Sequence, residues 1–285
     1  MLFRSDPARG PVELRLPRPA PALAPSSFIT GRVIGPDGLP VAGVTVSAYS
    51  VPTRGRGECA TGADGAFKLG PFPPGPWSVY LQPQRYPTLS VPAHDLAAGT
   101  TWDTGALRLV DGGIALIQVT GVPAGGDVSF TIRDGTRRPH GAAWIGDHRL
   151  QTWVLAPGDY KIVIACDGCA QRALPFAIRA GEETRMDARL EPGIRQRFEC
   201  VRADGAKVTG DLTHSLRCGD EVLIDERTLV YWNGPPVYAA DGAMTAALWL
   251  APGSYRLDLR EHDLAGSAAF TVSDREAAPL RIVLR

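Results

Sequence analysis

One short pattern occurs three times in this chain and limits its fold more than any other feature. In each copy a proline-glycine pair is followed by one residue, an aromatic residue and a run of alternating apolar residues. Proline fixes φ and has no N–H to donate, and glycine accepts φ values that other residues avoid, so the pair predicts a sharp chain corner. The copies are Pro74-Gly75 with Trp77, Pro157-Gly158 with Tyr160, and Pro252-Gly253 with Tyr255.

A β-strand is expected after each corner. Successive side chains of a strand point to opposite faces, so Tyr160, Ile162 and Ile164 share one face while Lys161 lies on the other. The third copy repeats this alternation, beginning at Tyr255. Each strand should therefore bury one face, its aromatic residue included, and expose the other to water.

The spacing of the corners predicts three units. Their glycines lie roughly 80 to 95 residues apart, a plausible size for a small domain. Each unit also ends in a similar apolar-charged strand. These three terminal strands lie at residues 106–109, 186–190 and 280–285.

The N-terminal segment, residues 1–27, repeats the terminal-strand signature at 11–16 before the proline-rich stretch 17–25. Two interpretations stay open. Residues 11–16 are either the last strand of a preceding module or an extra strand on the first sandwich. Under the first interpretation this chain is the C-terminal piece of a larger protein, and a signal peptide could lie upstream.

Composition favours an all-β fold. Glycine (32 residues) and proline (25) are abundant, and the 44% of hydrophobic residues fall in short runs, a combination typical of many short strands joined by tight turns. Asp-Gly pairs between such runs predict hairpin loops, because both residues tolerate positive φ. Seven pairs occur, at 37–38, 64–65, 111–112, 134–135, 167–168, 204–205 and 241–242.

Charge and hydropathy argue against two classes of partner. Lysine plus arginine equals aspartate plus glutamate, at 30 each, so the whole chain offers no electrostatic case for binding nucleic acid. No apolar run approaches the roughly 20 residues that cross a bilayer, and the chain's first residues lack the pattern of a signal peptide. We expect neither nucleic-acid binding nor membrane insertion.

The first unit, residues 28–110, carries a specific set of glycines, prolines and apolar residues around two Asp-Gly turns. These residues are Gly31, Val33, Asp37, Gly38, Pro40, Gly43, Val44, Val46, Asp64, Gly65, Phe67 and Gly75. The set resembles the carboxypeptidase regulatory-like family, whose pattern is Gly-x-Val, Asp-Gly, Pro-Val-x-Gly, Val-x-Val, Asp-Gly-x-Phe and the proline-glycine corner.

The resemblance implies a Greek-key β-sandwich of the transthyretin-like or immunoglobulin-like type. The family is typical of accessory modules in secreted or surface proteins, is related to carbohydrate-binding folds, and brings no catalytic residues of its own. The second unit (111–192) and the third (193–285) keep the corner and the terminal strand but lack Pro-Val-x-Gly. They are divergent copies or other sandwiches, and the chain is expected to be three tandem sandwiches.

Three groups of residues superficially match metal, acid-base or nucleotide sites. His140, Asp147 and His148 could surround a metal if a loop folded back, but their spacing fits polar loop residues better than any recognised ligand frame. Residues 261–263 (Glu-His-Asp) fit a solvated strand end, because adjacent strand residues point apart. The glycines of 55–60 superficially match a dinucleotide motif without the helix that the motif requires.

The five cysteines do not form a recognised zinc frame. Cys166 and Cys169 flank an Asp-Gly turn, whereas a redox Cys-x-x-Cys normally opens a helix. Whether these two thiols, or Cys200 and Cys218, form disulfides depends on the compartment. In an exported protein, Cys200 and Cys218 are a candidate disulfide within the third unit. No cofactor or metal is expected.

The aromatic residues at the corners are interpreted as structural, because they share a face with buried aliphatic residues and because a sandwich corner often hydrogen-bonds a tyrosine hydroxyl. The remaining aromatic residues are less constrained by pattern, and a sugar-stacking surface would have to use two or more of them. They are Trp102, Trp144, Trp153, Tyr231, Trp232 and Trp249.

Repetition without a catalytic set predicts a non-enzymatic structural or interaction protein, belonging to an exported or cell-surface protein of bacterial type. The alternative is a carbohydrate-binding protein that uses exposed aromatic side chains on a sandwich. The partner, whether protein or glycan, and the oligomeric state are not specified by the sequence.

Overall fold

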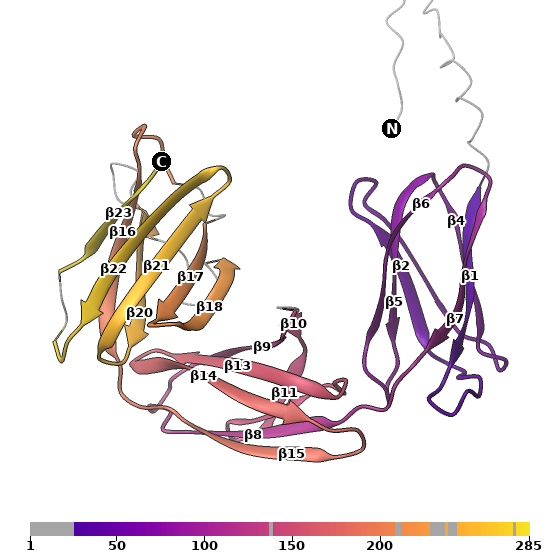
Figure 1. The fold of residues 1–285 in the computed structure, drawn as a ribbon, viewed down its shortest axis with the longest axis horizontal. Coiled ribbons are helices and arrows are strands. Elements are labelled where there is room, and N and C mark those ends of the chain that lie inside the picture. Colours follow the sequence, from indigo (N-terminus) through magenta and orange to yellow (C-terminus); the bar gives the residue numbers. More distant parts are fainter. Residues whose placement is uncertain (1–25, 137–138, 209–211, 229–236, 239–243, 276–277) are drawn as a thin grey trace, which may run out of the picture. The chain divides into compact units, whose positions relative to one another are not determined.

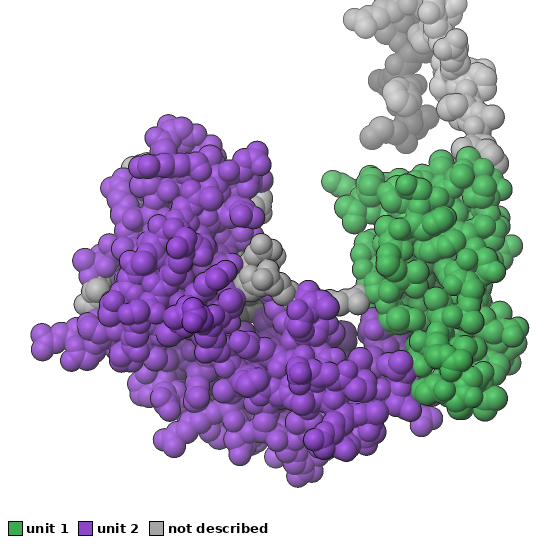
Figure 2. All heavy atoms as spheres, viewed as in Figure 1, with its two compact units in different colours: residues 1–82, 89–109 green, residues 83–88, 110–285 purple. Residues whose placement is uncertain are grey.

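The computed structural model describes residues 26–136, 139–208, 212–228, 237–238, 244–275 and 278–285, and the regular structure in these ranges is entirely β-strand (Figure 1). The all-β prediction is confirmed. The chain divides into two compact units (Figure 2): the first contains the chain to Gln82 and Leu89–Leu109, the second Pro83–Thr88 and Val110–Arg285. The expected strand at 11–16 lies outside the described residues.

The first sandwich consists of strands β1 to β7. One sheet has the order β4-β1-β7 and the other β3-β2-β5-β6. Strand β1 pairs with β7 in parallel and with β4 antiparallel. The strands are β1 (Ser27–Ile34), β2 (Thr45–Ser50), β3 (Gly55–Ala60), β4 (Ala66–Phe72), β5 (Gly75–Gln82), β6 (Leu89–Leu96) and β7 (Thr101–Arg108).

The second sandwich consists of strands β8 to β15. Its sheets have the orders β11-β12-β8-β15 and β10-β9-β13-β14, and β8 pairs with β15 in parallel. The strands are β8 (Ile114–Thr120), β9 (Val128–Asp134), β10 (Pro139–His140), β11 (Ala142–Gly146), β12 (Arg149–Thr152), β13 (Gly158–Cys166), β14 (Cys169–Ile178) and β15 (Glu183–Arg189).

The third sandwich consists of strands β16 to β23. Its sheets have the orders β19-β20-β16-β23 and β18-β17-β21-β22, and β16 pairs with β23 in parallel. The strands are β16 (Ile194–Arg202), β17 (Thr213–Cys218), β18 (Glu221–Thr228), β19 (Val237–Tyr238), β20 (Met244–Leu250), β21 (Gly253–Glu261), β22 (Leu264–Val272) and β23 (Leu280–Leu284).

All three sandwiches have the same strand order. If the strands of the second and third sandwiches are each counted from one to eight along the chain, one sheet has the order 4-5-1-8 and the other 3-2-6-7. The first sandwich follows the same order but lacks the fourth strand, an edge strand. In each, the corner glycine opens the sixth strand (β5, β13 or β21) where the chain crosses from one sheet to the other. The repeat seen in the sequence therefore corresponds to a repeated topology.

Each core lies between two sheets and is built from alternate strand residues. In the second sandwich, Ile117 of β8, Ile132 of β9 and Ile162 of β13 are fully buried in one cluster. The expected inner face of β13 is thus present. Its outer face is less exposed to solvent than alternation alone predicts, because Val163 and Ala165 are also buried and form a small second cluster.

The Asp-Gly pairs mostly do not form the expected hairpin loops. Within the described residues, Asp167-Gly168 is the pair that joins two adjacent strands as a two-residue loop, between β13 and β14. Two-residue loops elsewhere use other residues, and the remaining described Asp-Gly pairs lie in other turns and connections or, at Asp134, at a strand end. These other loops are Asp147-His148, Gly219-Asp220 and His262-Asp263.

Candidate functional site

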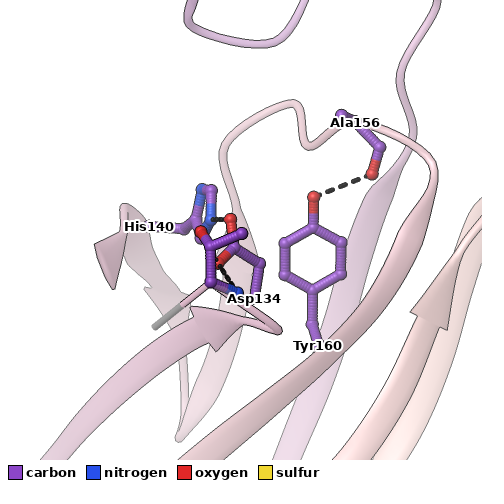
Figure 3. Close-up of polar contacts among 5 residues, drawn as sticks. Asp134, His140, Ala156 and Tyr160 are labelled. Atoms are coloured by element: carbon purple, nitrogen blue, oxygen red, sulfur yellow. Dashed lines mark hydrogen bonds and ion pairs between the residues drawn. The ribbon is translucent and has the colours of Figure 1, made fainter. Parts of the chain in front are cut away.

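The three corners make the same hydrogen bond. Tyr160 Oη donates to the carbonyl of Ala156 at 2.8 Å (Figure 3), and Tyr255 Oη donates to that of Ala251 at 2.8 Å. In the first sandwich the indole Nε1 of Trp77 donates to the carbonyl of Pro73 at 3.1 Å. In every case the acceptor lies four residues before the aromatic residue, and the ring itself is buried.

The corner glycines are less uniform. Gly75 has φ of 134° and Gly158 has φ of 153°, values that favour glycine. Gly253 is not among the glycines with positive φ, so the expected backbone requirement is wrong at the third corner. A Cβ there would instead lie 3.4 Å from the Tyr255 ring and 3.6 Å from Cys218 Sγ, which are ordinary contacts. Pro74, Pro157 and Pro252 each precede their glycine directly.

His140 pairs with an acid that the sequence did not single out. Its Nε2 lies 2.9 Å from Asp134 Oδ2, and its ring meets the edge of Tyr160 at a centroid distance of 5.2 Å (Figure 3). The other oxygen of Asp134 accepts hydrogen bonds from Thr136, which caps the turn after β9. Burial and, second, Asp134 raise the pKa of Tyr160. The group orders one end of the second sandwich.

Asp147 and His148 form the two-residue loop between β11 and β12, and His148 has φ of 51°. His262 has the same φ in the loop between β21 and β22. Histidine is one of the non-glycine residues found more often in this left-handed region. In the described part of the chain, no three histidine, cysteine or acidic residues are grouped to hold a metal. A turn role explains both histidines.

Glu261 is not part of a solvated strand end, as the sequence had indicated. It is fully buried at the end of β21, with Oε2 3.7 Å from Nη1 of Arg202. Arg202 also pairs with Asp204 at 2.8 Å. Buried charge requires such partners. Alternation along β21 accounts for the position, since Glu261 continues the inward face of Tyr255.

All five cysteines are free thiols. Cys200 lies on β16 in one sheet of the third sandwich and Cys218 on β17 in the other, so a disulfide between them would have to join the two sheets. That pairing stays a prediction for an oxidising compartment. Burial raises the pKa of Cys200 to about 12. Cys166 and Cys169 face each other across the β13–β14 hairpin, as the ladder register places them.

The less constrained aromatic residues divide by exposure. Trp102 and Trp249 are half-buried, and Trp102 stacks on His94. Trp144, on β11, is 40% exposed, and Trp153, directly after β12, is 60% exposed. Tyr231 and Trp232 lie outside the described residues.

The two exposed tryptophans do not form one stacking surface. Trp144 lies opposite the buried Leu150 and packs edge-on against Phe130. Trp153 follows the buried Thr152, so alternation directs it away from the core. The outer face of this sheet carries a groove of about 420 Å³, lined by Leu116, Gln118, Arg149, Arg185, Met186 and Asp187.

Several glycines of the first sandwich are explained by close packing. A Cβ on Gly31 would meet the Phe67 ring at 2.8 Å, and one on Gly65, with φ of 75°, would meet the Val33 carbonyl at 2.4 Å. Residues 55–60 form strand β3, where Gly55 and Gly57 lie against aromatic rings. The glycines there make room for the core and belong to no nucleotide-binding helix.

Residues 28–109 match the family model of the carboxypeptidase regulatory-like domain. The match begins in β1, runs through the first corner and ends just after β7. The resemblance drawn from the sequence is thereby confirmed for the first sandwich.

Solved structures show low similarity. The Bacillus anthracis TIE protein is 14% identical with a TM-score of 0.27, covering 92% of this chain, which spans 51% of that protein. GBS52, the minor pilin of Streptococcus agalactiae, is 13% identical with a TM-score of 0.30, over 59% of this chain and 96% of its own. BcpA, the major pilin subunit of Bacillus cereus, is 10% identical with a TM-score of 0.26, over 91% and 99%.

A comparison with curated proteins gave no match. No helix that could cross a membrane occurs in the part of the chain that the structure describes.

Replacing Tyr160 with phenylalanine should destabilise the second sandwich by about 1–2 kcal/mol, because the hydrogen bond is lost and a carbonyl is left without its donor. Urea unfolding followed by fluorescence measures this. Tyr86→Phe is the matched control, since Tyr86 is half-buried and no hydrogen bond of its hydroxyl is found among the described residues. Equal stability of Tyr160→Phe and wild type would show that the hydrogen bond from Tyr160 to Ala156 contributes nothing to stability.

The third sandwich should lose stability at alkaline pH. Burial, with Cys218 as the next cause, raises the pKa of Tyr255 from 10.0 to about 12. A raised folded-state pKa gives a contribution that is complete below pH 10 and is lost as the pH rises towards 12. The unfolding free energy should therefore fall over this range, and fall less in Tyr255→Phe. Identical slopes for the two proteins would contradict the assignment.

Proposed function

Because residues 28–109 match the carboxypeptidase regulatory-like family, we propose that this chain is a non-catalytic string of sandwich modules that spaces or docks other parts of an exported or cell-surface protein. The observation that carries the proposal is repetition: one strand order and one corner hydrogen bond occur three times. Repeated folding units suit a protein whose role is to present surfaces at set intervals along a chain.

In this proposal, the side chains that could take part in acid-base or metal chemistry have structural roles instead. His148 and His262 occupy turn positions, His140 pairs with Asp134, and Glu261 is buried beside Arg202. A catalytic site would need an acid, a base or a nucleophile to converge on a cavity. The groove of the second sandwich is lined by side chains that offer no such set.

The domain boundaries belong to the same proposal. We place the modules at residues 28–110, 111–192 and 193–285, each with its own pair of sheets. The second and third have separate buried clusters, although they belong to one compact unit. Each module is therefore expected to unfold as a separate step.

Stretching the full chain from its ends by single-molecule force measurement tests this organisation. Three unfolding events are expected, each releasing about 300 Å of extended chain, because a residue spans roughly 3.4 Å. Two events, one of them about twice as long as the other, would mean that the second and third modules unfold together. The proposal that each module unfolds independently would then be wrong for the second and third modules.

A carbohydrate-binding role is the second candidate, and one observation favours it. Trp153, the more exposed of the two tryptophans, directly follows β12, and alternation puts it on the same side as Arg149, which lines the outer groove of the second sandwich. An exposed indole beside polar side chains is a surface on which a sugar ring can stack.

Screening the full chain against immobilised glycans separates the two candidates. The structural proposal predicts no glycan binding above background. If a glycan binds, the stacking interaction predicts that Trp153→Ala reduces its affinity at least tenfold, while Trp144→Ala, on the other face, leaves it within about twofold. Binding that ignores Trp153 would exclude this surface as the glycan site.

A further inference from the structure

The tip of the β13–β14 hairpin holds two thiols at opposed positions. Cys166 ends β13 and Cys169 begins β14, and they are directly paired in the antiparallel ladder. The loop between them is Asp167-Gly168, where Gly168 has φ of 81°. Opposed residues of antiparallel strands have Cα atoms about 4.5–5.5 Å apart, within the range of about 4.4–6.8 Å that a disulfide accepts. The backbone therefore needs no large movement to join them.

Both thiols are buried, and each lies close to a backbone carbonyl. Cys166 Sγ lies 3.6 Å from the carbonyl of Asp167, and Cys169 Sγ lies 3.7 Å from that of Gly121. No other cysteine is in this sandwich, since Cys59 belongs to the first and the remaining two to the third.

The surrounding backbone holds the hairpin tip in place. The segment that leaves the sandwich runs beside it, with Gly193 N donating to the carbonyl of Gly168 at 2.9 Å and Ala170 N to that of Glu191 at 2.9 Å. On the other side, a Cβ on Gly126 would come within 2.9 Å of Cys166 Sγ. The two sulfur atoms are thus confined at a fixed place in the core cluster.

From this placement we propose that Cys166 and Cys169 are an oxidisable pair that forms a disulfide across the hairpin when the protein meets a low-molecular-weight disulfide. One cysteine thiolate attacks the external disulfide, forming a mixed disulfide and releasing one thiolate. The second cysteine thiolate then attacks the protein-bound sulfur and releases the other. Overall, two protein thiols are oxidised to one disulfide, and one external disulfide is reduced to two thiols.

The reaction is slow in the folded protein. Burial, followed by the influence of Cys169, raises the pKa of Cys166 to about 11, and burial raises that of Cys169. The thiolate is the attacking species, so little of it is present at neutral pH. Once formed, the bond would fix the hairpin tip beside the exit segment. This inference goes beyond the proposed function and does not depend on it.

The test uses the reduced full chain, incubated with oxidised glutathione until the reaction stops, then denatured, alkylated with a maleimide and weighed by mass spectrometry. Two of the five thiols are expected to escape alkylation. The tryptic peptide 162–172, which contains both cysteines, should be lighter by two hydrogens than in the reduced protein. Five reactive thiols at the end, or a link between other cysteines, would overturn the proposal.

Two variants provide the controls. Cys200→Ser removes a buried thiol of another sandwich and should still lose two thiols to the same link. Cys166→Ser should form no internal disulfide, leaving Cys169 free or carrying glutathione. Circular dichroism checks that the variants fold, with Cys169→Ala as the replacement if Cys166→Ser does not. If either hairpin variant still lost two thiols to an internal disulfide, the proposed disulfide between Cys166 and Cys169 would be contradicted.

Discussion

The crossing from one sheet to the other is the constraint on which each sandwich depends. At this point the chain must turn sharply, and the sixth strand must start with its inward face already set. The aromatic residue does both: its ring enters the core, and its polar atom binds the carbonyl four residues earlier. Trp77 performs this role in the first sandwich as the tyrosines do in the others, so the requirement is for a buried ring with a hydrogen-bond donor at its far end.

Sequence reasoning succeeded where local chemistry determines structure. The proline-glycine corner and the alternation after it identified three repeats, and the family signature identified the first sandwich. Gly31 and Gly65 illustrate why such a signature persists as a pattern: each lies where a Cβ would collide with a ring or a carbonyl of the same module. The topology that the modules share could not be derived this way, because strand order depends on pairings between distant segments.

The errors arose where a position is decided by register. Asp-Gly is a good local turn, yet three of the four two-residue loops between the described strands use other residues. One of them is Asp147-His148, whose histidine adopts the left-handed conformation. Glu261 was expected at a solvated strand end, but it lies on the face of β21 that points into the core. By contrast, the Asp-Gly turn between Cys166 and Cys169 does join adjacent strands, and the β13–β14 ladder places the two cysteines opposite each other. One residue of register separates a buried side chain from an exposed one.

The modules differ most at the edge of one sheet. The fourth strand, absent from the first sandwich, is present in the second as β11, which carries Trp144 and the exposed Ile145. An edge strand has one neighbour instead of two, so its side chains can change without disturbing the corner or the parallel pair of first and last strands. The second sandwich therefore carries exposed apolar side chains at an edge that leaves the core arrangement intact. The common fold of the modules is explained at the corner, and this edge is where they differ in strand number.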